Sequence, residues 1–121
     1  LFRSMYQTID LNTFAHAFEA HGRADQFTPD GLRVLFDYLA ELEASTDTPI
    51  ELDVVALCCD YSEDTVGELA DQHDIALAPD EAADMDATEQ ADALKAAVIA
   101  YLHDQTAVCG ATDGTIVYAV F

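Results

Sequence analysis

The sequence predicts a small α+β domain in which about four helices pack on one face of a mainly antiparallel three-stranded sheet. Three observations lead to this prediction: an apolar stripe with helical spacing, a continuous apolar run typical of a central strand, and a strong hairpin signal near the end of the chain. The chain has 121 residues, of which 51% are hydrophobic, so it can form one domain with one core. The predicted order is two helices, a strand, two helices and two strands.

Two helices are predicted in the first part of the chain. Residues 12–21 place Phe14 and Phe18 one turn apart, before a glycine that ends the helix. Residues 28–42 begin with a threonine N-cap and a proline at the first helical position, and leucines then recur along one face. Residues 45–49 are predicted to form a loop.

The middle of the chain predicts one strand and one helix. Apolar and acidic residues alternate from Ile50 to Val54, and residues 55–59 are continuously apolar. This pattern is typical of a strand that enters from solvent and becomes central. Ser62 is the expected N-cap of the helix that follows.

The last part of the chain predicts further helix and a hairpin. Residues 79–85 have the composition of a short helix, and Asp86, with Glu89 three residues later, resembles a capping box at the start of a longer one. Residues 106–109 and 115–121 are predicted strands, and the Asp-Gly pair between them is a typical hairpin turn.

The ends and the cysteines suggest how the chain is organised. Residues 1–4, before Met5, are interpreted as an expression-tag remnant, which leaves residues 5–121 as a single acidic domain. Two adjacent cysteines and one distant cysteine form no paired framework. We therefore expect reduced thiols and a location in the reducing environment of the cytoplasm.

Charge is the most unusual property of the sequence. There are 24 Asp and Glu residues against 4 Lys and Arg, giving a formal net charge of −20. This excludes a protein that binds nucleic acid through its own basic surface, and it argues against docking on anionic lipid. Between Arg33 and Lys95 lie 61 residues with 18 acids and no Lys or Arg. Ordinary surfaces mix both signs of charge, so this stretch needs an explanation.

Several acids occupy positions that a helix does not favour. Asp37 and Glu41, for example, are like charges four residues apart, which costs about 0.2–0.5 kcal/mol in an isolated helix. Two explanations remain open: a partner with a basic groove, or a salt-adapted surface as in halophiles, with a general protein-interaction role.

The partner explanation agrees with a size estimate. A globule of this length is roughly 35 Å across, and B-DNA of that length carries about 20 phosphate charges. The partner would be a basic nucleic-acid-binding protein. The candidate partner-binding acids are Glu41, Glu43, Glu51, Asp53, Asp60, Glu63, Asp64, Glu68, Asp71, Asp80, Asp84 and Asp86.

Two segments, Gly31–Glu43 and Ile50–Glu63, resemble a family of small acidic proteins from phages and other mobile elements. Some members of that family are anti-CRISPR proteins directed against type I systems, and the Leu-Cys-Cys-Asp-Tyr run at 57–61 is its most distinctive mark. The resemblance implies a stoichiometric inhibitor that occupies the DNA-binding surface of a CRISPR surveillance complex. It carries over no catalytic residues.

Other chemistries are weaker. Asp60, Ser62 and Asp64 match the first ligand positions of a calcium-binding EF-hand loop, but the later glycine and glutamate of that loop are absent. The cysteines and histidines lack zinc-ligand spacing, and no nucleophile elbow, phosphate loop or dinucleotide fingerprint occurs. We therefore expect no catalytic residue, no metal and no cofactor. A calcium-binding module is the remaining minor alternative.

Overall fold

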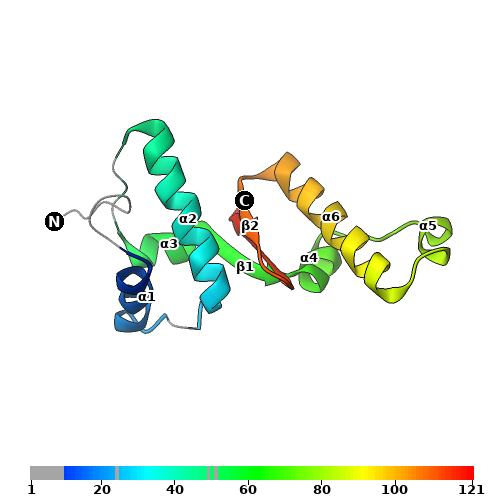
Figure 1. Ribbon diagram of the computed structural model, residues 1–121, viewed down its shortest axis with the longest axis horizontal. Coiled ribbons are helices and arrows are strands. Elements are labelled where there is room, and N and C mark those ends of the chain that lie inside the picture. The colour runs from blue at the N-terminus through cyan, green and yellow to red at the C-terminus, as the bar shows by residue number, and fades with distance from the viewer. Residues whose placement is uncertain (1–9, 24, 49, 51) are drawn as a thin grey trace.

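The computed structural model describes residues 10–23, 25–48, 50 and 52–121 (Figure 1). The predicted tag at residues 1–4 and the candidate Glu51 lie outside these residues. The elements in chain order are α1 (Leu11–Ala20), α2 (Pro29–Thr46), α3 (Val54–Asp60), β1 (Tyr61–Thr65), α4 (Val66–Gln72), α5 (Pro79–Ala83), α6 (Ala87–Gln105), β2 (Val108–Ala111) and β3 (Thr115–Ala119). The predicted α+β class is confirmed, with six helices among the described residues rather than about four.

The sheet has the strand order β1-β3-β2, and both pairings are antiparallel. The predicted hairpin is confirmed between β2 and β3. It is closed by the Thr112 N–H, which donates to the Thr115 carbonyl at 2.9 Å. Strand β3 is therefore central, and β1 reaches it from the middle of the chain, with Glu63 opposite Val117.

Helices cover both faces of this sheet, so the prediction of helices on one face was wrong. Ile116, Val117 and Tyr118 are consecutive and all buried, although alternate residues of a strand point to opposite faces. Val117 packs in a core with α1, α2 and α3, whereas Ile116 and Tyr118 pack in a second core with α4 and α6. Figure 1 shows the two helical groups on opposite sides of the sheet.

The predicted strand at residues 50–59 was also wrong, because residues 54–60 form helix α3. Asp53 is its N-cap, and the Asp53 side chain accepts a hydrogen bond from the Ala56 N–H at 3.1 Å. Val54, Leu57 and Cys58 are buried, at helical spacing, while Val55 and Cys59 are exposed. Two exposed apolar residues therefore concealed the helical period and made the run resemble a central strand.

The predicted start of the next helix, at Ser62, was therefore also wrong. Ser62 lies inside β1 and does not cap a helix. The N-cap of α4 is Thr65, which forms a complete capping box with Glu68. Helix α2 likewise extends to Thr46, into the predicted loop, where the Thr46 hydroxyl donates to the Leu42 carbonyl at 2.8 Å.

Candidate functional site: an acidic arm

The chain between the end of α4 and the middle of α6 carries little of the core. We call residues 74–92 the acidic arm. None of its residues is buried, and its half-buried apolar side chains are Ile75, Leu77, Ala82 and Met85. In Figure 1 the arm, with α5 at its tip, projects from the end of the molecule opposite α1.

A few local hydrogen bonds shape the arm. Asp86 caps α6, its carboxylate accepting from the Glu89 N–H at 2.8 Å. The Gln90 amide donates to the carbonyls of Ala82 at 3.0 Å and Met85 at 3.1 Å, which ties α5 to the first turn of α6. Caps and turns therefore order the outer part of the arm, while Ile75 packs its base against the core formed with α4, α6 and β3.

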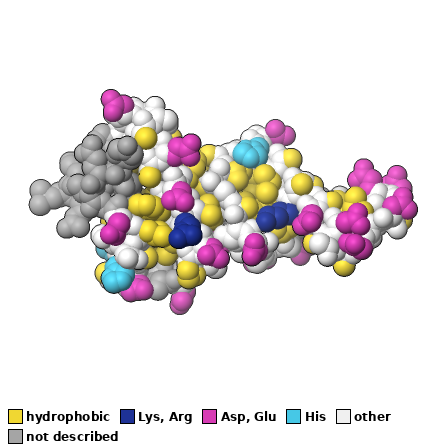
Figure 2. Space-filling model, viewed as in Figure 1, with side chains coloured by type: hydrophobic (Ala, Val, Ile, Leu, Met, Phe, Trp, Pro, Cys, Tyr) yellow, Lys and Arg dark blue, Asp and Glu magenta, His cyan; other side chains and the backbone are white. Residues whose placement is uncertain are grey.

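Every carboxylate of the arm is exposed. Because the arm contains no Lys, Arg or His, its seven acids give it a formal charge of −7. Figure 2 shows acidic side chains gathered around the end of the molecule that α5 forms. The seven are Asp74, Asp80, Glu81, Asp84, Asp86, Glu89 and Asp92.

The structure brings only part of the predicted acidic set together. Asp80, Asp84 and Asp86 lie on the arm. Glu41 and Asp60 are exposed but lie on α2 and α3, on the other side of the sheet. Asp71 is exposed near the end of α4 and borders the arm. Asp53 is the exposed N-cap of α3, and Glu68 is the exposed capping-box partner of Thr65 in the first turn of α4.

Glu43 is a buried carboxylate and not part of an acidic surface. Its exposed fraction is 5%. One carboxylate oxygen accepts from the Ile50 backbone N–H at 2.7 Å, which holds the segment after α2 against the helix. A charge reversal at Glu43 would place an ammonium in this buried site and disturb the core, so the prediction that Glu43 belongs to the partner-binding surface was wrong.

Glu63 is also a structural carboxylate. It accepts hydrogen bonds from the Thr28 N–H and the Thr28 hydroxyl, each at 2.7 Å, and from the Thr115 hydroxyl. It thereby joins the start of α2 to the sheet. A Cβ atom at Gly31, in the first turn of α2, would overlap the Glu63 carboxylate, which explains the glycine at that helical position.

Asp64 faces the second core. Its carboxylate accepts from the Ser62 hydroxyl at 3.1 Å and from the Tyr118 hydroxyl. Burial, followed by this hydrogen bond, raises the pKa of Tyr118 to about 12. Asp64 therefore supports the packing of β1 against β3.

Sequence reasoning missed four carboxylates of the arm: Asp74, Glu81, Glu89 and Asp92. A signal for them was present, because they share the stretch without Lys or Arg that contains the predicted acids. The density of acids between residues 74 and 92, in a segment with few large apolar residues, marks the arm better than any single position does.

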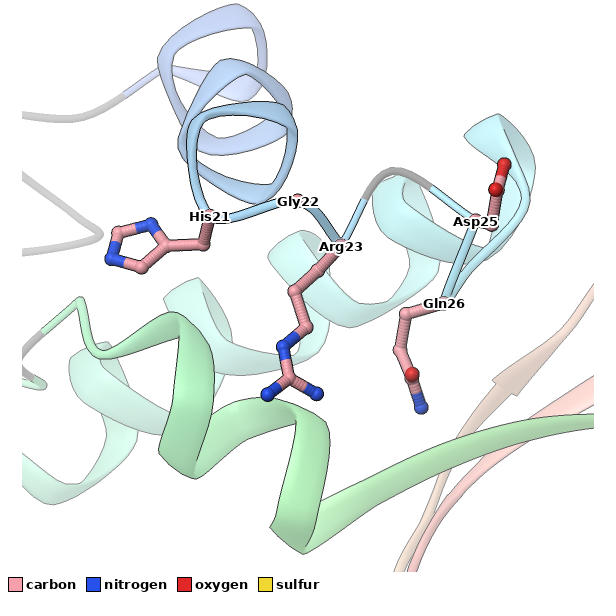
Figure 3. Close-up of a pocket in the computed structure, with 5 residues that line it drawn as sticks. All are labelled: His21, Gly22, Arg23, Asp25 and Gln26. Carbon is pink, nitrogen blue, oxygen red and sulfur yellow. The ribbon is translucent and has the colours of Figure 1, made fainter.

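A separate pocket of about 420 Å³ lies where α1 leads into α2, beside His21, Arg23 and Gln26 (Figure 3). Figure 3 shows the Arg23 side chain pointing towards α3, while His21 points away from it. The His21 ring nitrogen Nδ1 is 2.9 Å from the Ala17 carbonyl. These side chains do not converge on a common point, as the members of a nucleophile–base pair must.

The calcium alternative is not supported by the positions of its residues. Asp60 ends α3, Ser62 and Asp64 lie on β1, and the Asp64 carboxylate is bonded to Ser62 and Tyr118. In the described part of the chain, no three His, Cys, Asp or Glu side chains are arranged to hold a metal ion. None of the described helices combines the length and the apolar character needed to span a membrane.

Comparisons of the chain with family models, with curated proteins and with solved structures give no match. Function is therefore argued from the residues and the structure.

Proposed function

We propose that this protein is a stoichiometric inhibitor that imitates DNA, an anti-CRISPR that blocks target-DNA binding by a type I CRISPR surveillance complex. The observation that carries the proposal is the acidic arm, a projecting segment with seven exposed carboxylates and no basic residue. The grooves of nucleic-acid-binding proteins are lined with Lys and Arg side chains, which bind the phosphates of the nucleic acid. A dense set of exposed carboxylates can occupy the same side chains. The family resemblance of the Gly31–Glu43 and Ile50–Glu63 segments supports the choice of a CRISPR complex.

The charge of the arm can be compared with that of DNA. The arm carries seven carboxylates and no basic residue. B-DNA carries one phosphate charge per about 1.7 Å of its axis, so seven charges correspond to about 12 Å of duplex. The arm therefore offers the charge of a short segment of duplex.

Inhibition of this kind needs no chemical step. Carboxylates on the arm attract the basic groove over a long range and accelerate encounter. Once bound, the protein excludes the duplex from the Lys and Arg side chains that would contact phosphates. Since attraction between charges weakens as ions screen it, the affinity for the target falls steeply as salt rises.

The test compares two variants that each lose three exposed carboxylates. The arm variant is D80N/D84N/E89Q, and the matched control on the α1–α2 side is D25N/D37N/E41Q. Each is titrated into a purified type I surveillance complex with a labelled target duplex, with thermal melts as a folding control. A gel-shift experiment with the duplex and the protein alone checks that the protein does not bind DNA itself.

We expect the arm variant to lose at least about tenfold in competing affinity and the control variant to lose less than about threefold. Equal losses in the two folded variants would show that the arm is not the binding surface. Failure of the wild-type protein to compete with DNA, or a shift of DNA by the protein alone, would refute the proposal.

A second candidate is an acidic domain adapted to high salt. It is favoured by exposed acids outside the arm, such as Asp25, Asp37 and Asp47, and by the acidic side chains that Figure 2 shows along the whole visible face. Screening is nearly complete at 1 M salt, where the Debye length is about 3 Å. A melting temperature that keeps rising above 1 M would favour this candidate over simple relief of repulsion.

A further inference from the structure

A pocket beside the acidic arm differs in chemistry from the arm itself. It lies between the start of α4, the middle of α6 and the β2–β3 hairpin turn, and its volume is about 310 Å³. We call it the hairpin pocket. Its surface is mainly apolar, formed by Val66, Gly67, Ala91 and Leu94, in contrast to the polar pockets beside His21 and beside Tyr38.

Two exposed carboxylates stand at the border of this apolar surface. Asp92 comes from α6 and Asp113 from the hairpin turn, and both line the pocket. Lys95 also lines it, and the Lys95 ammonium is held at the hairpin turn, where it donates to the carbonyls of Thr112 at 2.6 Å and Asp113 at 3.4 Å. The aliphatic stem of Lys95 is left to extend the apolar wall.

We propose that the hairpin pocket receives an arginine side chain of the basic partner. The methylene stem of an arginine would pack on Val66, Ala91 and Leu94, and its guanidinium would meet the carboxylates of Asp92 and Asp113. A guanidinium is planar and weakly hydrated, so it tolerates an apolar surface better than the strongly hydrated ammonium of a lysine. Arginines in such pockets are common anchors of protein interfaces.

Glycine makes the space for this side chain. A Cβ atom added at Gly67, the second residue of α4, or at Gly114, in the turn, would meet no atom within 4 Å. The two glycines therefore leave the space beside the backbone open at both positions.

This inference deepens the proposed function, on which the identity of the partner rests, but its test does not need the target. The probe is N-acetyl-arginine amide, a single guanidinium with no carboxylate, titrated into the ¹⁵N-labelled protein and followed by the backbone amide shifts. N-acetyl-lysine amide is the matched ligand. We expect saturable shifts at Gly67, Gly114 and their neighbours, with a Kd in the millimolar range, and at least about threefold weaker binding of the lysine analogue.

Two variants and two controls locate the binding. Gly67→Leu fills the hollow, and Asp92→Asn removes one carboxylate; each should abolish the localised shifts or weaken them at least about fivefold. Ala100→Leu and Asp104→Asn introduce the same side chains at exposed positions of α6 outside both the pocket and the arm, and they should leave the shifts unchanged. Because Gly67 has open space around its Cα, Gly67→Leu should fold at least as stably as the wild-type protein.

Three results would overturn the inference. They are amide shifts spread evenly over residues with exposed carboxylates, equal binding of the arginine and lysine amides, and an unchanged response in a folded Gly67→Leu variant. These results would leave the competition experiment on the surveillance complex unaffected. Conversely, localised arginine binding combined with no competition against DNA would refute the proposed function while the pocket stands.

Discussion

Replacement of Glu63 by alanine should destabilise the fold strongly, although Glu63 resembles the other acids of the sequence. Its carboxylate receives the Thr28 N–H, the Thr28 hydroxyl and the Thr115 hydroxyl, so it connects the start of α2 with β1 and β3. These elements contribute to the core on one face of the sheet. Its loss therefore loosens the junction between the longest helix of that core and the sheet.

The size of the effect follows from the bonds that are lost. Hydrogen bonds to a charged group contribute about 1.5–3 kcal/mol each. Thr28 is exposed, so water replaces part of what Glu63 supplied there, whereas Thr115 is only half-exposed. We expect Glu63→Ala to lower the free energy of unfolding by about 2–4 kcal/mol, a large share of the typical 5–15 kcal/mol. The melting temperature should fall by roughly 10–20 °C.

Gly31 gives this prediction a second, sharper form. In the wild-type protein a Cβ at position 31 overlaps the Glu63 carboxylate, so Gly31→Ala should be destabilising despite the better helix propensity of alanine. In the Glu63→Ala background the obstacle is gone, and the same change should become stabilising, by up to about 1 kcal/mol. The sign of the Gly31→Ala effect should therefore invert between the two backgrounds.

The measurement is a double-mutant cycle, with urea unfolding followed by circular dichroism at constant salt. Glu41→Ala is the control, because it removes an exposed carboxylate from α2, the helix that contains Gly31, and should change stability by less than about 0.5 kcal/mol. Two results would refute the structural role assigned to Glu63. One is an equal change in the free energy of unfolding for Glu63→Ala and Glu41→Ala. The other is an additive change for Gly31→Ala and Glu63→Ala.

Three further predictions follow from the same structure. Raising salt from low ionic strength should stabilise the isolated protein and then level off near 1 M, as measured by the melting temperature; a flat response would show that repulsion between carboxylates is negligible. Glu43→Lys should not fold stably, whereas Glu43→Gln should retain an acceptor for the Ile50 N–H and lose about 1–3 kcal/mol; urea unfolding of the two variants checks this. Burial raises the pKa of both Tyr61 and Tyr118 to about 12, above the value of about 10 of an unfolded tyrosine. The stability that the two neutral hydroxyls contribute is therefore present below pH 10 and is lost between about pH 10 and 12. Unfolding free energies across this range should flatten in Tyr118→Phe, and an unchanged slope would contradict the burial of that hydroxyl.

Sequence reasoning succeeded where a local signal specifies the structure. The Thr28 cap before Pro29, the Asp86 cap and the Asp113–Gly114 turn each act within three or four residues, and all three appear in the structure. It failed at residues 54–60, where burial by the rest of the fold decides which apolar residues face inward. The Thr65–Glu68 capping box was visible in the sequence, and it would have placed the start of α4 correctly.

The candidate site was predictable in its total charge but not in its position. Glu43 turns inward to a backbone N–H seven residues away, and Glu63 meets Thr28, which is 35 residues away. No local pattern distinguishes these carboxylates from the exposed ones, because their partners are brought to them only by the tertiary fold. The acids of the arm, in contrast, are all exposed, and their density marks the arm in the sequence.

Two of the structural carboxylates are satisfied by neutral donors. Glu63 accepts from the Thr28 N–H and from two threonine hydroxyls, and Asp64 accepts from a serine and a tyrosine hydroxyl. Hydrogen bonding therefore stabilises these two carboxylates, while their negative charge still contributes to the field of the protein. The exposed carboxylates of the arm add to the same field, because the arm itself contains no cation. A surface of this kind gains most from a partner that brings its own Lys and Arg. The carboxylates of the arm are exposed and, apart from Asp86, which caps α6, can be changed without removing a hydrogen bond described above. This separation is what allows the arm to be neutralised as a test of function while the fold is retained.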